Sequence, residues 1–169
     1  MNVILCGMMG SGKTTVSYAL AKLLGFERAD TDECIVDRYG KIADIFDKQG
    51  EEYFREVETQ ITEELSQKDR LVISTGGGLV LKEKNVELLK KSGLIVYLRA
   101  SIPTLAKRLS ADKDRPLLKT EEGLEKRLIS LMRERSPIYE KAASFTVDVD
   151  DKTPEKIANE IIGHVRGEK

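Results

Sequence analysis

The chain has 169 residues, of which 28 are Lys or Arg and 29 are Asp or Glu, and its formal net charge is −1. A length of about 100 to 200 residues is typical of one domain, so we expect a single domain over residues 1–169. The balanced charge gives no electrostatic reason to expect a nucleic acid or an anionic membrane as a partner. The longest uncharged run, 1–12, is shorter than the roughly 18 residues of a membrane-spanning helix.

Two features of the sequence predict a cytoplasmic protein. No basic residue precedes Lys13, so a secretory signal with a charged start is not expected. The two cysteines, Cys6 and Cys34, fall in different predicted elements and match no metal-binding spacing. Such thiols are usually small core residues of proteins in a reducing compartment.

Short apolar runs alternate with helical patterns along the chain. Runs rich in β-branched residues predict strands at 2–6, 71–74, 94–98 and 145–149, with a weaker strand at 26–30. Apolar residues at helical spacing predict helices at 14–24, 53–65, 86–90, 102–109, 124–132 and 154–165. This alternation predicts an α/β domain with a five-stranded parallel sheet covered by helices on both faces. Ligands of such folds bind at the carboxyl ends of the strands.

The first predicted strand runs directly into a phosphate-binding motif. Residues 7–14 read GMMGSGKT, a full match to GxxxxGK[ST], and they open the first predicted helix. Glycines in such a loop let backbone amides converge on phosphate oxygens, and the helix N-terminus adds partial positive charge. We expect Lys13 to reach the β- and γ-phosphates and the Thr14 hydroxyl to bind Mg²⁺. The motif predicts nucleotide binding but leaves the reaction open.

P-loop proteins include GTPase switches, mechanical ATPases and small-molecule kinases. The NKxD motif that GTPases use for guanine is absent from the sequence. DxxG occurs at 37–40 and 47–50, within helical or helix-ending patterns rather than after an apolar strand, and we interpret both as accidental. A conventional Walker B strand ending in Asp is missing too, because the strand at 71–74 runs into Thr75 and three glycines.

Two carboxylates follow the weaker strand at 26–30. Asp30 and Asp32, at i and i+2 on an extended segment, would point the same way. Beside a P-loop, one of them can hold Mg²⁺ through its water shell while the other accepts from an acceptor hydroxyl, and we expect Asp30 to be the metal partner. The alternative is a solvated acidic turn in which Thr31 or Asp32 caps the next helix. The P-loop upstream favours the functional interpretation.

A run of three glycines, Gly76 to Gly78, ends the strand at 71–74. Three glycines in a row cost backbone entropy, so they need a physical reason. Bare backbone would let a substrate approach closely and would offer N–H donors. The alternative is a tight strand-to-helix turn, which needs one or two glycines rather than three.

Arginines supply the remaining candidates. Arg55 borders the apolar stripe of its helix, where it could be a surface charge paired at helical spacing with Glu51, Glu52 or Glu58. Arg115 lies in a charged stretch, about 109–123, whose composition suggests a mobile lid over the transferring phosphoryl group. Arg133 and Arg135 close a later helix. Two or more arginines in one cleft would imply an anionic acceptor, since arginine grips carboxylates bidentately.

The ordered set GMMGSGKTT, DTD, IADIFDKQGEEYFRE, STGGG, RPLL and ERSPIYEKAA resembles the shikimate kinase family over essentially the whole chain. The resemblance implies ATP-dependent phosphorylation of the 3-hydroxyl of shikimate, with Mg²⁺, in aromatic amino-acid biosynthesis. It also implies a P-loop nucleotide-monophosphate-kinase-like fold with strand order 2-3-1-4-5.

The same resemblance implies roles for individual residues. The catalytic residues would be Lys13, Asp32 and Arg115. ATP would contact Gly10, Ser11, Gly12, Lys13, Thr14, Thr15, Arg108, Arg115 and Lys152, with Thr14 also binding Mg²⁺. Shikimate would contact Asp32, Arg55, Gly76, Gly77, Gly78 and Arg135. No role is implied for Arg133, which we interpret as structural.

Two other classes of function stay open at this point. One is a regulatory protein that binds nucleotide without catalysis, and the complete set of Lys13, Asp32 and Arg115 argues against it. The other is a subunit of a larger assembly. The charged helices carry no wide second apolar stripe, which predicts a monomer.

Overall fold

The computed structural model describes residues 1–111 and 121–167. Its strands are β1 (Asn2–Cys6), β2 (Glu27–Asp30), β3 (Leu71–Ser74), β4 (Gly93–Arg99) and β5 (Phe145–Asp148). They form one parallel sheet in the order β2-β3-β1-β4-β5. The predicted sheet and its strand order are confirmed, and each strand ends within one residue of its predicted range.

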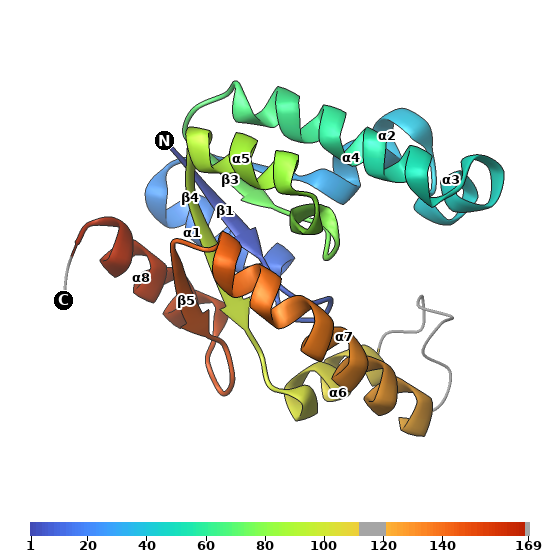
Figure 1. Cartoon of the computed structure of the whole chain (residues 1–169). Coiled ribbons are helices and arrows are strands. Elements are labelled where there is room, and N and C mark those ends of the chain that lie inside the picture. Colours follow the sequence, from blue (N-terminus) through green and yellow to red (C-terminus); the bar gives the residue numbers. More distant parts are fainter. Residues whose placement is uncertain (112–120, 168–169) are drawn as a thin grey trace.

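Helices cover both faces of this sheet. They are α1 (Lys13–Leu24), α2 (Thr31–Tyr39), α3 (Ile42–Gln49), α4 (Glu51–Ser66), the 3₁₀ turn η1 (Leu79–Leu81), α5 (Glu83–Ser92), α6 (Ile102–Ser110), α7 (Glu121–Ala142) and α8 (Pro154–Val165). On one face α1 packs against α8, and on the other α5 and α7 contact β4 (Figure 1). Right-handed crossovers explain this, because the chain leaves β1 and β3 in opposite directions across the sheet. Within the described residues, no helix is long and apolar enough to cross a membrane.

The core lies around the central strands. Every residue of β1 and β3 is buried, as expected for a parallel sheet covered on both faces. Both cysteines are free thiols. Burial raises the pKa of Cys6 to about 12, so this thiol is an unreactive core group, as predicted.

The longest helix, α7, extends well beyond its predicted end at 132 because it continues through Pro137. A proline inside a helix removes one backbone hydrogen bond and ordinarily ends the helix. Here Tyr139 anchors the last turns: its buried ring stacks on Tyr97 with centroids 5.2 Å apart, and its hydroxyl donates to the Gly77 carbonyl at 2.5 Å. Arg133, whose carbonyl would accept the missing bond, is exposed. Tertiary packing therefore outweighs the helix-breaking residue.

Two short helices lie between β2 and α4. The DxxG tetrads end α2 and α3, at Gly40 and Gly50, which confirms that neither is a GTPase motif. We had not predicted α3 as a separate helix, although Ile42, Ile45 and Phe46 carry the i, i+3, i+4 spacing that indicates one. This helix positions two apolar side chains at the cleft described next.

Candidate active site

Strand register brings three loops to one edge of the sheet. Leu5 of β1 pairs with Ser74 of β3, and Ser74 pairs in turn with Asp30 of β2. The P-loop, the glycine turn and the DTD segment therefore begin side by side at the carboxyl ends of their strands. A cavity of about 440 Å³ lies at this edge, where ligands of α/β sheets bind.

The cavity gathers most of the residues predicted for the site. The predicted residues that line it are Gly10, Gly12, Lys13, Thr14, Thr15, Asp30, Asp32, Arg55, Gly76, Gly77, Gly78, Arg108 and Arg135. Ser11 and Lys152 line a smaller cavity of about 270 Å³, which shares Gly12, Thr15 and Arg108 with the first. Arg115 and the centre of the predicted lid lie outside the described residues, since α6 ends at Ser110 and α7 begins at Glu121.

The P-loop forms a cradle of backbone groups around its lysine. Lys13 Nζ donates to the carbonyls of Gly7 at 2.6 Å and Met8 at 3.0 Å. Gly12 has a φ of 94°, a left-handed conformation that favours glycine, and begins α1 without a side-chain cap. The Ser11 hydroxyl is buried and has no hydrogen-bond partner among the described residues. A buried, unpartnered donor next to a helix N-terminus fits a bound phosphate group.

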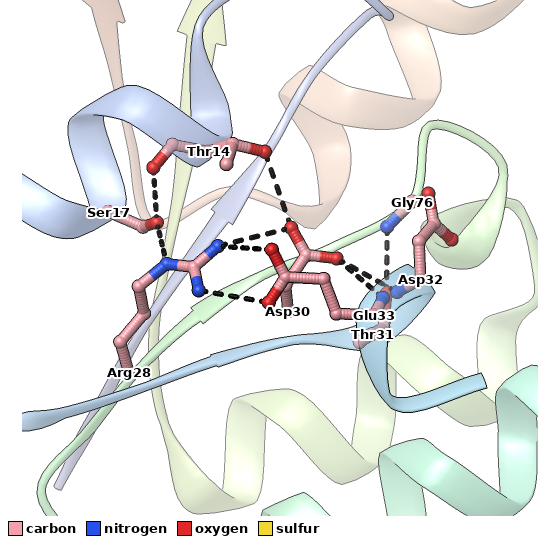
Figure 2. Close-up of polar contacts among 8 residues, drawn as sticks. All are labelled: Thr14, Ser17, Arg28, Asp30, Thr31, Asp32, Glu33 and Gly76. Atoms are coloured by element: carbon pink, nitrogen blue, oxygen red, sulfur yellow. Dashed lines mark hydrogen bonds and ion pairs between the residues drawn. The ribbon is translucent and has the colours of Figure 1, made fainter. Parts of the chain in front are cut away.

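Asp30 joins the P-loop helix to α2. Its Oδ1 accepts from the amides of Asp32 at 2.9 Å and Glu33 at 3.1 Å, and its Oδ2 accepts from the Thr14 hydroxyl at 3.3 Å (Figure 2). The expected extended segment and the capping residues of the alternative interpretation are therefore both wrong. Thr31 begins a helix, so Asp32 lies in a helical turn rather than on an extended segment, and the capping residue is Asp30 rather than Thr31 or Asp32. Capping at Asp30 prevails because one carboxylate oxygen satisfies two otherwise unpaired amides.

A cluster of charged side chains lines the cavity beside the glycine turn. Arg55 Nη1 donates to Glu58 Oε1 at 2.6 Å, and its Nη2 donates to Glu51 Oε1 at 3.5 Å. The ion pairs expected of a surface arginine are therefore present, yet Arg55 also lines the cavity. The Glu58 side chain is only 2% exposed. Burial raises the pKa of Glu58, and the hydrogen bond and charge of Arg55 oppose this rise.

Glu58 is a site residue that the sequence interpretation missed. Its i+3 spacing from Arg55 predicted an ion pair but gave no sign that the pair is buried beside Asp32 and Arg135. A signal was available in the apolar stripe of α4, because Glu58 directly follows Val57, which is buried in the core. A carboxylate next to a core position is more often buried than one on the opposite face of a helix.

Arg135 comes from α7 and faces the glycine turn. Its buried Nε has no hydrogen-bond partner within the described part of the chain. Tyr139, one turn further, fixes the turn by donating to the Gly77 carbonyl, and burial raises the pKa of this phenol to about 12. A buried guanidinium nitrogen beside an open cavity fits an anionic group of a ligand.

Close approach of side chains explains the glycine turn. A methyl group at Gly76 would lie 2.7 Å from Asp32 Oδ1, and one at Gly78 would lie 2.5 Å from Arg55 Nη1. Gly76, Gly77 and Gly78 all have ordinary backbone conformations, so left-handed geometry is not the reason for them. The charged side chains of this cluster therefore pack directly on the bare backbone. The close approach of a substrate to these glycines stays a prediction.

Comparison with known proteins agrees with this geometry. The family described as shikimate kinase matches residues 9–166 of the chain. The chain belongs to the shikimate kinase family. A shikimate kinase from Thermodesulfovibrio yellowstonii is 44% identical over 162 residues, which cover 95% of this chain and 92% of that protein.

Solved shikimate kinases share the fold over nearly the full length. The structure of the Acinetobacter baumannii shikimate kinase, determined in complex with shikimate, has a TM-score of 0.91 and 38% identity, covering 99% of this chain and 94% of that one. The Aquifex aeolicus shikimate kinase has a TM-score of 0.83 and 35% identity, covering 99% and 97%. Membership in the shikimate kinase family makes the protein an ATP-dependent kinase rather than a GTPase switch or a mechanical ATPase.

Proposed function

We propose that the chain transfers the γ-phosphoryl group of ATP to the 3-hydroxyl of shikimate, in aromatic amino-acid biosynthesis. The observation that carries the proposal is a single cavity with two chemically different ends. The P-loop end offers amides and Lys13 to phosphates. The other end offers the Asp32 carboxylate and the guanidinium groups of Arg55 and Arg135 to a hydroxylated carboxylic acid.

Nucleotide phosphates bind along the P-loop, from Gly10 to Thr15, and Lys13 neutralises the β- and γ-phosphates. Arg108 Nη1 donates to the Gly10 carbonyl at 3.1 Å. Lys152, paired with Glu160 at 3.0 Å, lies on the smaller cavity beside it, which we assign to the adenine. Arg115 is assigned to the transferring phosphoryl group on the sequence alone.

The oxygen atoms of Thr14 and Asp30 fit a Mg²⁺ ion. A hydroxyl and a carboxylate, held 3.3 Å apart at the P-loop, are the hard oxygen donors that Mg²⁺ prefers. Within the described residues there is no cluster of three or more His, Cys, Asp or Glu ligands. This suits a kinase, in which phosphates and waters complete the shell around Thr14 and, through water, Asp30. Bound there, the ion would neutralise charge on the phosphate oxygens.

The acceptor end positions shikimate for transfer. Asp32 accepts a hydrogen bond from the 3-hydroxyl and turns its oxygen toward the γ-phosphate. Arg55 and Arg135 hold the carboxylate and thereby decide which hydroxyl faces the nucleotide. The backbone of Gly76, Gly77 and Gly78 flanks the ring, next to the side chains of Asp32 and Arg55 that pack on it.

We also propose that the protein is a cytoplasmic monomer made of one domain. Free thiols at Cys6 and Cys34 suit a reducing compartment. Gel filtration tests the monomer: elution at the mass of a dimer would contradict it.

A phosphate-transfer assay with a panel of acceptors tests the reaction. Shikimate, gluconate and nucleoside monophosphates are each supplied with ATP and Mg²⁺, and ADP formation is followed. We expect rapid turnover with shikimate and only background rates with the others. Equal rates with another acceptor, or with no acceptor, would contradict the proposal.

Replacing Arg55 with Lys should raise the KM for shikimate by about tenfold or more. Lysine keeps the charge but loses the planar fork, so one charge-assisted hydrogen bond of about 1.5 to 3 kcal/mol is lost. The KM for ATP and the melting temperature should hardly change. Steady-state kinetics with each substrate varied measures the effect, and an unchanged shikimate KM would return Arg55 to a surface role.

Replacing Gly78 with Ala should also raise the shikimate KM by about tenfold, because the new methyl group displaces the Arg55 guanidinium and the loss of one charge-assisted hydrogen bond is worth that much. The atom displaced is the end of a flexible side chain, so the melting temperature should change by no more than about 3 °C.

Gly163→Ala on α8 is the matched control, since nothing lies within 4 Å of its added methyl group. It should leave the KM unchanged and add about 0.5 to 1 kcal/mol of stability. Equal KM values for the two variants would refute this explanation of the glycine turn.

A further inference from the structure

Arg28, on β2, has no role in the reaction described above, yet all of its polar groups are engaged beside the nucleotide end of the cavity. Its Nε donates to the Ser17 hydroxyl at 2.8 Å, and its Nη1 and Nη2 donate to the two carboxylate oxygens of Glu33 at 3.0 and 3.1 Å (Figure 2). The guanidinium also lies 3.8 Å from the centre of the Tyr18 ring. The Arg28 side chain is only 13% exposed, so this geometry is held by packing as well as by hydrogen bonds.

These contacts lead to both residues of the Mg²⁺ site. Arg28 Nη2 lies 3.6 Å from Asp30 Oδ2, the oxygen that accepts from the Thr14 hydroxyl. Ser17, which anchors Arg28 Nε, donates in turn to the Thr14 carbonyl at 2.5 Å. Arg28 therefore reaches Asp30 directly and Thr14 through Ser17, and it ties α1 to the first turn of α2 (Figure 2).

We propose that Arg28 is a positioning residue that fixes the Asp30 carboxylate against Thr14 and so supports Mg²⁺–nucleotide binding. The inference rests on the proposed role of Asp30 and Thr14 in holding Mg²⁺. The amides of Asp32 and Glu33 hold only Oδ1 of Asp30. The position of Oδ2, the oxygen on the Thr14 side, depends on Thr14 and Arg28.

Charge and position act in opposite directions on Mg²⁺ binding at this site. A lone arginine beside Asp30 would repel a cation and weaken its binding. Arg28, however, is paired with both oxygens of Glu33, so the two side chains together carry no net charge. Removing Arg28 leaves the carboxylates of Glu33 and Asp30 without this cation, which by charge alone would favour Mg²⁺. The weaker Mg²⁺ binding that we expect therefore comes from the lost position of Asp30. Only the arginine fork can contact Ser17, Glu33 and Asp30 at once, so lysine should not substitute for it.

The test compares ADP affinity with and without Mg²⁺ by calorimetry in the wild type, Arg28→Met and Arg28→Lys. Residues behind a metal ligand typically change metal affinity by about 10- to 100-fold, so we expect Arg28→Met to lose about tenfold of the gain in ADP affinity that Mg²⁺ provides. Metal-free ADP affinity and the shikimate KM should stay close to wild type. Arg28→Lys should show the same loss. Tighter Mg²⁺–ADP binding, or a Lys variant equal to wild type, would overturn the positioning role.

A metal-free measurement separates positioning from general stability. Hydrogen exchange at the amides of Asp32 and Glu33 should quicken in Arg28→Met, because both amides donate to Asp30. Arg38→Met is the matched control. Arg38 lies on α2, the helix that contains Asp32 and Glu33, and it pairs with Glu64, but it is exposed and does not line the cavity. It should alter neither readout. Ser17→Ala is the second variant if Arg28→Met folds poorly. It removes the acceptor of Arg28 Nε and the hydrogen bond to the Thr14 carbonyl, and it should shift both readouts in the direction expected of Arg28→Met.

The outcomes distinguish this inference from the proposed function. A wild type that forms no ADP with shikimate, or an Asp30→Asn variant with normal Mg²⁺–ADP affinity, would refute the proposed function or its metal site. An active wild type, an impaired Asp30→Asn and a normal Arg28→Met would refute the role of Arg28 alone.

Discussion

Replacing Asp32 with Asn is expected to lower kcat by about 10² to 10⁴-fold while ATP affinity stays near wild type. Asn keeps the shape of the side chain but cannot accept the proton of the shikimate hydroxyl. Asp32 lines the cavity beside the glycine turn, and its carboxylate is not one of the P-loop groups that we assign to ATP. His164, the only histidine in the sequence, is exposed on α8 and stacks on Phe145, remote from the cavity.

Glu58 is the control for this experiment, because its carboxylate also lines the cavity but contacts Arg55. It holds Arg55 at 2.6 Å, so Glu58→Gln should change the shikimate KM more than kcat. Single-turnover rates and calorimetric ATP binding for both variants measure the difference. Near-normal turnover by Asp32→Asn, or a larger kcat loss in Glu58→Gln, would contradict the central role of Asp32.

Replacing Arg115 with Ala should lower kcat by about 10² to 10³-fold and weaken ATP binding far less. A cation that contacts the phosphoryl group only while negative charge develops on its oxygens stabilises the transition state more than the bound ground state. The described end of α6 supports this placement: Arg108 bonds to the Gly10 carbonyl, and Leu109 would lie 3.0 Å from a methyl group at Gly10. The chain therefore leaves α6 beside the P-loop.

Arg127→Ala is the matched control for Arg115→Ala, since Arg127 is exposed on α7 near the same segment. Its kcat should stay near wild type, with a change in activation free energy within about 0.5 kcal/mol, the size typical of surface substitutions. Steady-state kcat and calorimetric ATP affinity are measured for both variants. A loss in Arg115→Ala that is confined to ATP affinity would show that Arg115 only anchors the ground-state nucleotide.

The parts of the fold that follow from local patterns were predictable. The buried strands β1 and β3 are apolar except for Asn2 and Ser74, and the P-loop motif predicts the turn that follows β1. The end of α7 was not predictable, because the ring of Tyr97 and the carbonyl of Gly77, which hold Tyr139 beyond Pro137, are distant in sequence. Local propensity alone indicates a helix end at that proline.

The site shows the same division. Motifs located the P-loop, the DTD segment and the glycine turn, since each follows a strand directly. The contacts of Glu58 and Arg28 were not foreseen, because they depend on how α4 and β2 are turned toward the cavity. Arg28 meets Ser17 and Asp30 only after β2 has paired with β3 and α1 has packed on the sheet. Such contacts become visible only in three dimensions.

A crystal structure of the chain with ADP, Mg²⁺ and shikimate is the most direct test of how the cavity orients the acceptor toward the nucleotide. We expect the shikimate carboxylate within hydrogen-bond distance of Arg55 and Arg135, and the 3-hydroxyl on Asp32 facing the P-loop. A carboxylate bound elsewhere, or a different hydroxyl on Asp32, would contradict this expectation.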